Sequence, residues 1–203
     1  MNILEITQAF GNRPCFTARD AVLRFPELDG RQLPRWRANG WLLQLRKPYY
    51  RVASRAWTTH ERWAVANSIY SPSYISLETA LGHYGFIPEG VFHITCITTR
   101  HTREFEIEGT KHFYRNVLPS WFFGYVMLEQ GDVAVRMAGP EKALLDLLHF
   151  NRNLRGPDDF EALRLDRIGI RETINPEVWQ DHLALSTNKA LHRRARAFQR
   201  WLR

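Results

Sequence analysis

Three glutamates and a lysine near the middle of the chain have a pattern that could bind a catalytic metal ion. Glu104, Glu106 and Glu108 alternate along a predicted strand, and Lys111 follows them. A metal-dependent nuclease needs acidic ligands of this kind that converge at one point. Three like charges on one face of a strand are more typical of a solvated face or a protected sheet edge. We therefore predict that this group is not catalytic and that the protein is not an enzyme.

A second acid–base group, Glu141, Lys142 and Asp146, lies in the segment GPEKALLDLL. Its spacing is also typical of a structural helix. Pro140 suits the first position of a helix, and Glu141 complements the partial positive charge at that end. The leucines recur at the interval of a buried helix face. We predict a core helix over residues 140–150 without a catalytic role.

A predicted third helix carries side chains that could read DNA. Asp29 is its expected N-cap, and the helix runs to Asn39 with Gly40 behind it. Leu33 and Trp36 are three residues apart and point toward a core. Arg31, Arg35 and Ala38 then lie on the opposite face, with Gln32 and Asn39 beside them. Arginine suits guanine edges and phosphates, whereas glutamine and asparagine suit adenine edges. The predicted DNA-contacting residues of this helix are Arg31, Gln32, Arg35 and Asn39.

Pro34 disagrees with a regular helix at this place. A proline inside a helix costs about 3 kcal/mol, so the helix starts near Leu33 or has a distorted first turn. Either case affects Arg31 and Gln32 more than Arg35 and Asn39, which follow the proline.

Two further helices and a basic hairpin surround this element. One helix ends at Gly11, and a second is predicted over residues 18–25, with Thr17 as its cap. Strands are predicted over residues 41–45 and 49–52. Three helices and a hairpin are the parts of a winged helix-turn-helix, whose third helix enters the major groove and whose wing lies on the backbone. The basic tip of the hairpin gives the predicted wing contacts, Arg46 and Lys47.

Charge is unevenly distributed along the chain. Residues 1–57 carry ten Lys and Arg against four Asp and Glu, residues 58–186 carry twelve against seventeen, and residues 187–203 carry six basic residues and no acid. A basic face is the electrostatic signature of binding to a phosphate backbone. The break predicts two domains: a DNA-binding head over residues 1–57, and a body over residues 58–203 that ends in a basic tail.

The tail has the pattern of an amphipathic helix. Lys189, Arg193, Arg196 and Arg200 follow one another at intervals of three or four residues. Apolar residues at positions between them form a second face of the helix. This pattern indicates a helix that docks on the body through its apolar face and leaves its basic side free. We predict that Arg193, Arg196 and Arg200 make a second DNA contact. A plain solvated face and binding to a membrane surface are the alternatives.

The sequence of the body predicts helices, then strands, then further helices. Such an order, with an antiparallel meander in the middle, predicts an α+β fold. The first helices are expected over residues 59–70 and 76–84, and the strands over 92–98, 103–108, 111–117, 125–128 and 132–137. The last helices are expected over residues 140–150, 158–163, 176–185 and 188–202.

Four segments resemble one known family. They are SLETALGHYGFIPEGV (76–91), ITCITTRHTREFEIEG (94–109), FFGYV (122–126) and GPEKALLDLLHF (139–150), in this order. Over about residues 16–150 the chain resembles the AbiEi family, the antitoxin and transcriptional-regulator half of type IV toxin–antitoxin systems. The resemblance implies a DNA-binding head, an α/β antitoxin body, repression of its own operon and a cognate nucleotidyltransferase-like toxin. It also implies that the third helix reads bases and that Arg46 and Lys47 are wing contacts.

Other classes of protein lack support in the sequence. Cys15 and Cys96 are far apart, which fits two reduced, partly buried thiols. The histidines lack metal-binding spacing, and no glycine-rich phosphate loop occurs. We therefore expect no metal ion and no cofactor. The N-terminus lacks the features of a signal peptide, and no apolar run is long enough to span a bilayer, so we expect a soluble cytoplasmic protein.

The sequence thus predicts a DNA-binding transcriptional repressor that acts as an antitoxin. Its expected partners are double-stranded DNA, as an inverted repeat in its own promoter, and a nucleotidyltransferase-like toxin that it need not touch. Two alternatives stay open: a DNA-processing enzyme, such as a nuclease, with a winged-helix targeting head, and an adaptor whose body holds a protein partner.

Overall fold

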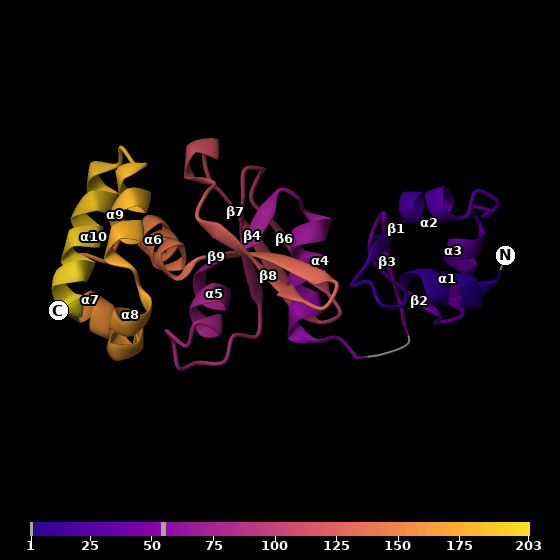
Figure 1. The fold of residues 1–203 in the computed structure, drawn as a ribbon, viewed down its shortest axis with the longest axis horizontal. Helices are drawn as coiled ribbons and strands as arrows, with labels where there is room; N and C mark the ends of the chain where they lie inside the picture. The colour runs from indigo at the N-terminus through magenta and orange to yellow at the C-terminus, as the bar shows by residue number, and fades with distance from the viewer. Residues whose placement is uncertain (1, 54–55) are drawn as a thin grey trace.

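The computed structural model describes residues 2–53 and 56–203. The molecule is elongated, with the head at one end, a large sheet in the middle and helices α6 to α10 at the other end (Figure 1). Buried apolar side chains form two separate clusters, one within the head and one through the body. The described part of the chain therefore has an α+β fold, which confirms the predicted class. The division at residue 57 stays a prediction.

In the head, three short helices pack with a three-stranded antiparallel sheet. Thr17 caps the second helix as predicted: its hydroxyl accepts a hydrogen bond from the Asp20 N–H (3.1 Å), and the Asp20 carboxylate accepts one from the Thr17 N–H (2.7 Å). The strand order is β1-β3-β2. The elements are α1 (Ile3–Phe10), β1 (Phe16–Thr17), α2 (Ala18–Arg24), α3 (Gln32–Ala38), β2 (Leu42–Arg46) and β3 (Tyr49–Val52).

Helix α3 begins two residues later than a cap at Asp29 would require. Arg31 occupies the N-cap position and its side chain makes no capping bond, so the prediction for Asp29 was wrong. Pro34 is the third residue of α3, within the first turn, where backbone N–H groups have no acceptor inside the helix. The proline is tolerated there for this reason. Gly40 follows the helix with φ of +73°, a left-handed conformation that glycine adopts without strain.

The sheet of the body is mixed, and the predicted antiparallel meander was wrong. Six strands lie in the order β6-β7-β5-β4-β9-β8, and the pairs β4–β9 and β5–β7 are parallel. The remaining neighbours are antiparallel. The strands are β4 (Ser73–Ile75), β5 (Ile94–Thr98), β6 (Arg103–Ile107), β7 (Thr110–Asn116), β8 (Tyr125–Gln130) and β9 (Val133–Ala138).

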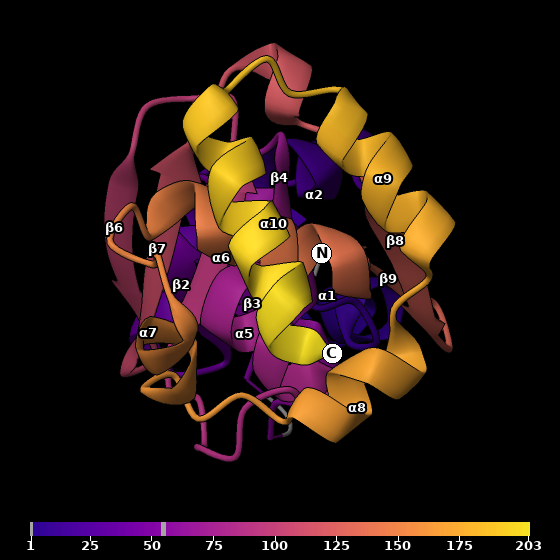
Figure 2. The ribbon, with the colours of Figure 1, turned by 90° about the vertical axis from the view of Figure 1, so that its left-hand side faces the viewer.

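Helices pack against this sheet, and further helices lie beyond it at one end of the molecule. Helix α4 packs on β4, β5 and β9, and α5 packs on β5 and α6. Helix α6 matches its predicted bounds and contacts α9 and α10, and α8 was not predicted. Figure 2 shows α10 lying across the end of the molecule in front of α6. The helices are α4 (Thr59–Ile69), α5 (Leu77–His83), α6 (Pro140–Phe150), α7 (Pro157–Glu161), α8 (Arg167–Thr173), α9 (Pro176–Ala184) and α10 (Lys189–Leu202).

A buried carboxylate connects α6 to the sheet. Asp146 accepts hydrogen bonds from the hydroxyls of Tyr74 (3.0 Å) and Ser76 (2.8 Å) and from the indole N–H of Trp121 (2.8 Å), and it pairs with Lys142. The side chains of Lys142 and Asp146 are fully buried, and the Lys142 ammonium lies 4.2 Å from the ring centre of Trp121. Burial lowers the pKa of Lys142, and Asp146 acts in the opposite direction. This placement favours a structural role for the pair.

The tip of the β2–β3 hairpin packs against the body. Leu45 belongs to the buried cluster of the body. The Tyr49 hydroxyl donates a hydrogen bond to the Ser68 carbonyl at 2.8 Å. The guanidinium of Arg46 lies 3.9 Å from the ring centre of Phe105 in β6. The hairpin therefore joins the head to one edge of the body sheet.

The two free thiols are expected to react slowly in the folded protein. Cys15 lines a cavity between head and body, and burial, as the main cause, raises its pKa to about 11. Burial also raises the pKa of Cys96 in β5. Since the thiolate is the nucleophile, labelling by iodoacetamide at pH 8 should be at least about tenfold slower in the native protein than in urea. Equal labelling rates of Cys15 in both states would contradict this placement.

Candidate nucleic-acid interface

Helix α3 has one buried face and one exposed face, as its period predicts. Leu33 and Trp36 are only 4% and 5% exposed and pack in the core of the head. Arg31, Arg35 and Asn39 are exposed on the other side of the helix. The core of the head thus fixes the orientation of α3, so that its basic side faces solvent.

Two of the four predicted side chains on α3 have partners within the head. The Arg31 guanidinium pairs with Asp29 (Nη2 to Oδ2, 2.9 Å), although 91% of the Arg31 side chain is exposed. This contact lowers the pKa of the Asp29 carboxyl. The Gln32 side-chain oxygen accepts a hydrogen bond from the Asp29 N–H at 3.1 Å. Arg31 and Gln32 are therefore engaged at the start of the helix.

Arg35 and Asn39 are the exposed pair that these contacts leave available. Within residues 2–53 and 56–203, neither side chain makes a hydrogen bond or ion pair. Arg37, one position away from Trp36, is instead hydrogen-bonded to the Gln44 side chain of β2. This bond holds the C-terminal half of α3 against the sheet. A guanidinium and a carboxamide one turn apart can bind base edges or phosphate oxygens.

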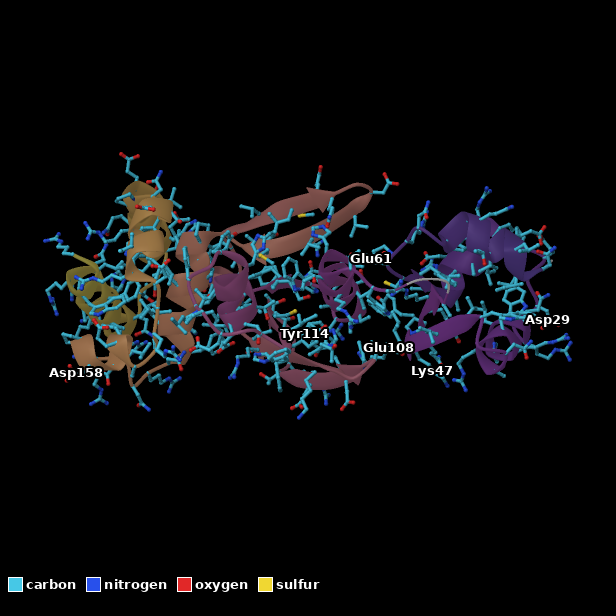
Figure 3. The ribbon with its side chains drawn as sticks, turned by 90° about the horizontal axis from the view of Figure 1, so that it is seen from below. Asp29, Lys47, Glu61, Glu108, Tyr114 and Asp158 are labelled. Carbon is cyan, nitrogen blue, oxygen red and sulfur yellow. The ribbon has the colours of Figure 1, made fainter. Side chains whose placement is uncertain are left out.

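The predicted wing contacts lie on a different side of the head. Seen from below (Figure 3), Asp29, three residues before α3, lies toward the outer end of the head, and Lys47 lies toward the body. Lys47 is exposed. Arg46 is exposed as well, but its guanidinium is stacked on Phe105. The hairpin tip therefore has a structural role at the head–body contact, which weakens the prediction that Arg46 binds DNA.

The tail helix has the predicted arrangement. Its apolar side is buried against the body, and Arg193, Arg196 and Arg200 are exposed. Arg194 is the exception among the tail arginines, because it is buried and its Nε donates a hydrogen bond to the Leu148 carbonyl at 2.7 Å. Helix α10 and helix α3 lie at opposite ends of the long axis (Figure 1). The buried positions of α10 include Leu191, Ala195, Phe198 and Leu202.

Neutralising the three exposed tail arginines is expected to reduce non-specific DNA affinity. Each phosphate contact contributes about 0.9 to the slope of log affinity against log salt. Arg193→Gln, Arg196→Gln and Arg200→Gln together should therefore lower that slope by roughly 2–3. The ratio of affinities for operator and random DNA should hardly change. An unchanged slope in a triple variant with a native circular dichroism spectrum would show that these arginines do not reach DNA.

The acidic residues considered for metal binding lie at the edge of the sheet. Glu104 and Glu106 are exposed on β6, an edge strand, and Glu106 is directly opposite Lys111 of β7. Glu108 lies outside the strand, in the following turn, with φ of +49°. Within the described residues, no group of three or more His, Cys, Asp and Glu side chains is placed to hold a metal ion.

The basic loop after β5 is held by internal hydrogen bonds. The Thr98 hydroxyl donates to the Pro72 carbonyl at 2.7 Å, and Arg100 Nη1 donates to the Ser71 carbonyl at 3.3 Å. The Arg100 guanidinium also lies 4.3 Å from the ring centre of Tyr70. These groups stabilise the connection between β5 and β6.

No protein-family model matches this chain, and comparison with curated proteins gives no significant match. The resemblance to the AbiEi family therefore stays a prediction that rests on the four sequence motifs. None of the helices in the described parts of the chain is long and apolar enough to cross a membrane.

Proposed function

We propose that this protein is a DNA-binding transcriptional repressor and the antitoxin of a type IV toxin–antitoxin system. The observation that carries the proposal is the exposed side of α3. Arg35 and Asn39 lie there without partners among the described residues, while Leu33 and Trp36 anchor the opposite side in the core. A helix fixed in this way can enter a major groove with its contacting side chains already oriented.

The finer description of the head belongs to the same proposal. Helices α1 to α3 followed by the β2–β3 hairpin have the element order of a winged helix-turn-helix. In this arrangement α3 is the recognition helix. The hairpin differs from a free wing because its tip packs on Phe105 and Ser68 of the body. Base reading is therefore assigned to α3, and contact with the body to the hairpin.

The repression mechanism is occupancy of the promoter. The head reads an inverted repeat upstream of the gene, and exposed arginines add attraction to the phosphate backbone. Because α3 and α10 lie at opposite ends of the molecule (Figure 1), a duplex that touches both must follow the long axis or bend around it. The antitoxin role rests on the resemblance of the body to the AbiEi family, with a nucleotidyltransferase-like protein as the toxin.

A reporter assay tests repression in cells. The DNA upstream of the gene drives a reporter, and the protein is supplied from a second promoter. We expect the wild-type protein to lower reporter output and Arg35→Ala to restore most of it, because the variant loses a base contact. Equal output with wild-type protein, Arg35→Ala and empty vector, at matched protein levels, would contradict autorepression.

A further inference from the structure

A cavity of about 360 Å³ lies between α8, α9 and α10, at the end of the molecule remote from the head. These three helices face the viewer in Figure 2. Its volume lies within the range of small-molecule sites, roughly 300–1,000 Å³. Polar and apolar groups share its wall: Arg171, Gln199 and Arg203 are the polar side chains, and Ile174, Trp179 and Leu202 are among the others.

The Trp179 side chain contributes to this wall, and its indole nitrogen is buried beneath the wall surface. The side chain is 1% exposed, and its ring stacks on Phe198 with 5.7 Å between ring centres. The indole nitrogen is buried and has no acceptor in the part of the chain that the structure describes. Trp179 is therefore a fixed part of the wall, and its indole resonance can report a ligand in the cavity.

The guanidinium groups of the two cavity arginines are available to bind a ligand. Neither Arg171 nor Arg203 makes a hydrogen bond or ion pair within residues 2–53 and 56–203. Arg167 on the same helix as Arg171 is different, because its Nε donates to the Leu202 carbonyl at 3.3 Å and its guanidinium lies over the Trp201 ring. Guanidinium groups bind carboxylates and phosphates through paired N–H donors.

We propose that this cavity binds a small organic anion, a carboxylate or phosphate group carried on a flat apolar body. The two arginines take the anionic oxygens. Ile174, Leu202 and the neighbouring methylene groups contact the apolar part. The site is independent of the proposed DNA-binding function, because none of its residues lies in the head or among the predicted DNA-contacting residues of the tail.

Nuclear magnetic resonance of the full chain tests this site. Phenyl phosphate and benzoate are titrated into ¹⁵N-labelled protein, and the Trp179 indole resonance is identified by its loss in Trp179→Phe. We expect at least one of the two anions to shift this resonance with a saturating curve. If phenyl phosphate binds more tightly, the site prefers a phosphate group. If benzoate binds more tightly, the site prefers a carboxylate. Inorganic phosphate and phenol, which supply the charge and the ring separately, are expected to bind at least about tenfold more weakly.

Charge variants distinguish a built site from general attraction to a basic surface. Arg171→Gln with Arg203→Gln should weaken binding of phenyl phosphate or benzoate at least about tenfold. Lys189→Gln removes a positive charge from α10 outside the cavity and should leave the affinity unchanged. The proposal is overturned if neither organic anion shifts the Trp179 resonance. It is also overturned if phenol or inorganic phosphate binds equally well, or if Lys189→Gln has the same effect as the double variant. None of these results would alter the DNA-binding proposal.

Discussion

Asp146→Ala is expected to lower the free energy of unfolding by about 3–5 kcal/mol, as removal of one partner from a buried ion pair does. The substitution leaves the Lys142 ammonium buried without its counter-charge. It also removes the acceptor shared by Tyr74, Ser76 and Trp121, and each buried donor without a partner costs further stability. Tyr74 lies in β4, Ser76 follows that strand, and Trp121 lies in the segment before β8. Because these donors come from separate segments, the loss of stability should affect the whole body.

Urea unfolding followed by circular dichroism measures this effect. Asp146→Asn keeps one carbonyl oxygen in place and should be less destabilising than alanine. Asp158→Ala is the matched control: it removes a carboxylate from α7, exposed at the far end of the molecule (Figure 3), and should change stability by less than about 1 kcal/mol. A loss from Asp146→Ala no larger than that of the control would show that the buried network does not stabilise the fold.

Arg35→Ala is expected to weaken operator binding by about 1–3 kcal/mol and to relax sequence specificity. The exposed guanidinium of Arg35 has no partner among the described residues, so its removal should not disturb the head. The affinity for random DNA should fall much less than the affinity for the operator, because Arg35 makes no base-specific contact with random DNA. Arg155→Ala, an exposed arginine at the other end of the molecule, is the control and should bind operator like the wild type.

A fluorescence-anisotropy titration of each variant with operator and with scrambled DNA separates these outcomes. Unchanged operator affinity for Arg35→Ala would show that α3 is not the reading element. An equal loss on both DNAs would make Arg35 a phosphate contact instead of a base contact.

Local elements could be predicted because short-range signals define them. The three-residue interval between Leu33 and Trp36 gave the buried face of α3 correctly. The Thr17–Asp20 pair gave the start of α2, because both hydrogen bonds of the cap join neighbours in sequence. The cap at Asp29 failed because its carboxylate binds Arg31 instead of a helical N–H further along.

The order of the sheet could not be predicted in the same way. β4 has only three residues, all buried, so it lacks the alternation that marks a half-exposed strand. Its position between β5 and β9 depends on pairing with residues that are distant in sequence. The contact of Arg46 with Phe105 is equally long-range. The sequence therefore shows a basic hairpin tip but not the surface against which it packs.

The spacing of Lys142 and Asp146 was visible, but the burial of this pair was not. An i, i+4 pair of opposite charges is ordinarily a feature of an exposed helix face. Here the pair lies under Trp121 and beside Tyr74, which come from separate segments. The spacing of the two residues does not predict this buried environment, because the environment forms only when the sheet and α6 pack together.

We propose above all that this chain binds its own upstream DNA specifically. The most direct measurement is a titration of the full chain, at physiological salt, against the DNA upstream of its gene and against scrambled DNA of equal length and composition. We expect the upstream fragment to bind on the order of a thousandfold more tightly than the scrambled DNA, which is the lower end for specific regulators. Equal affinities for the two fragments would contradict it.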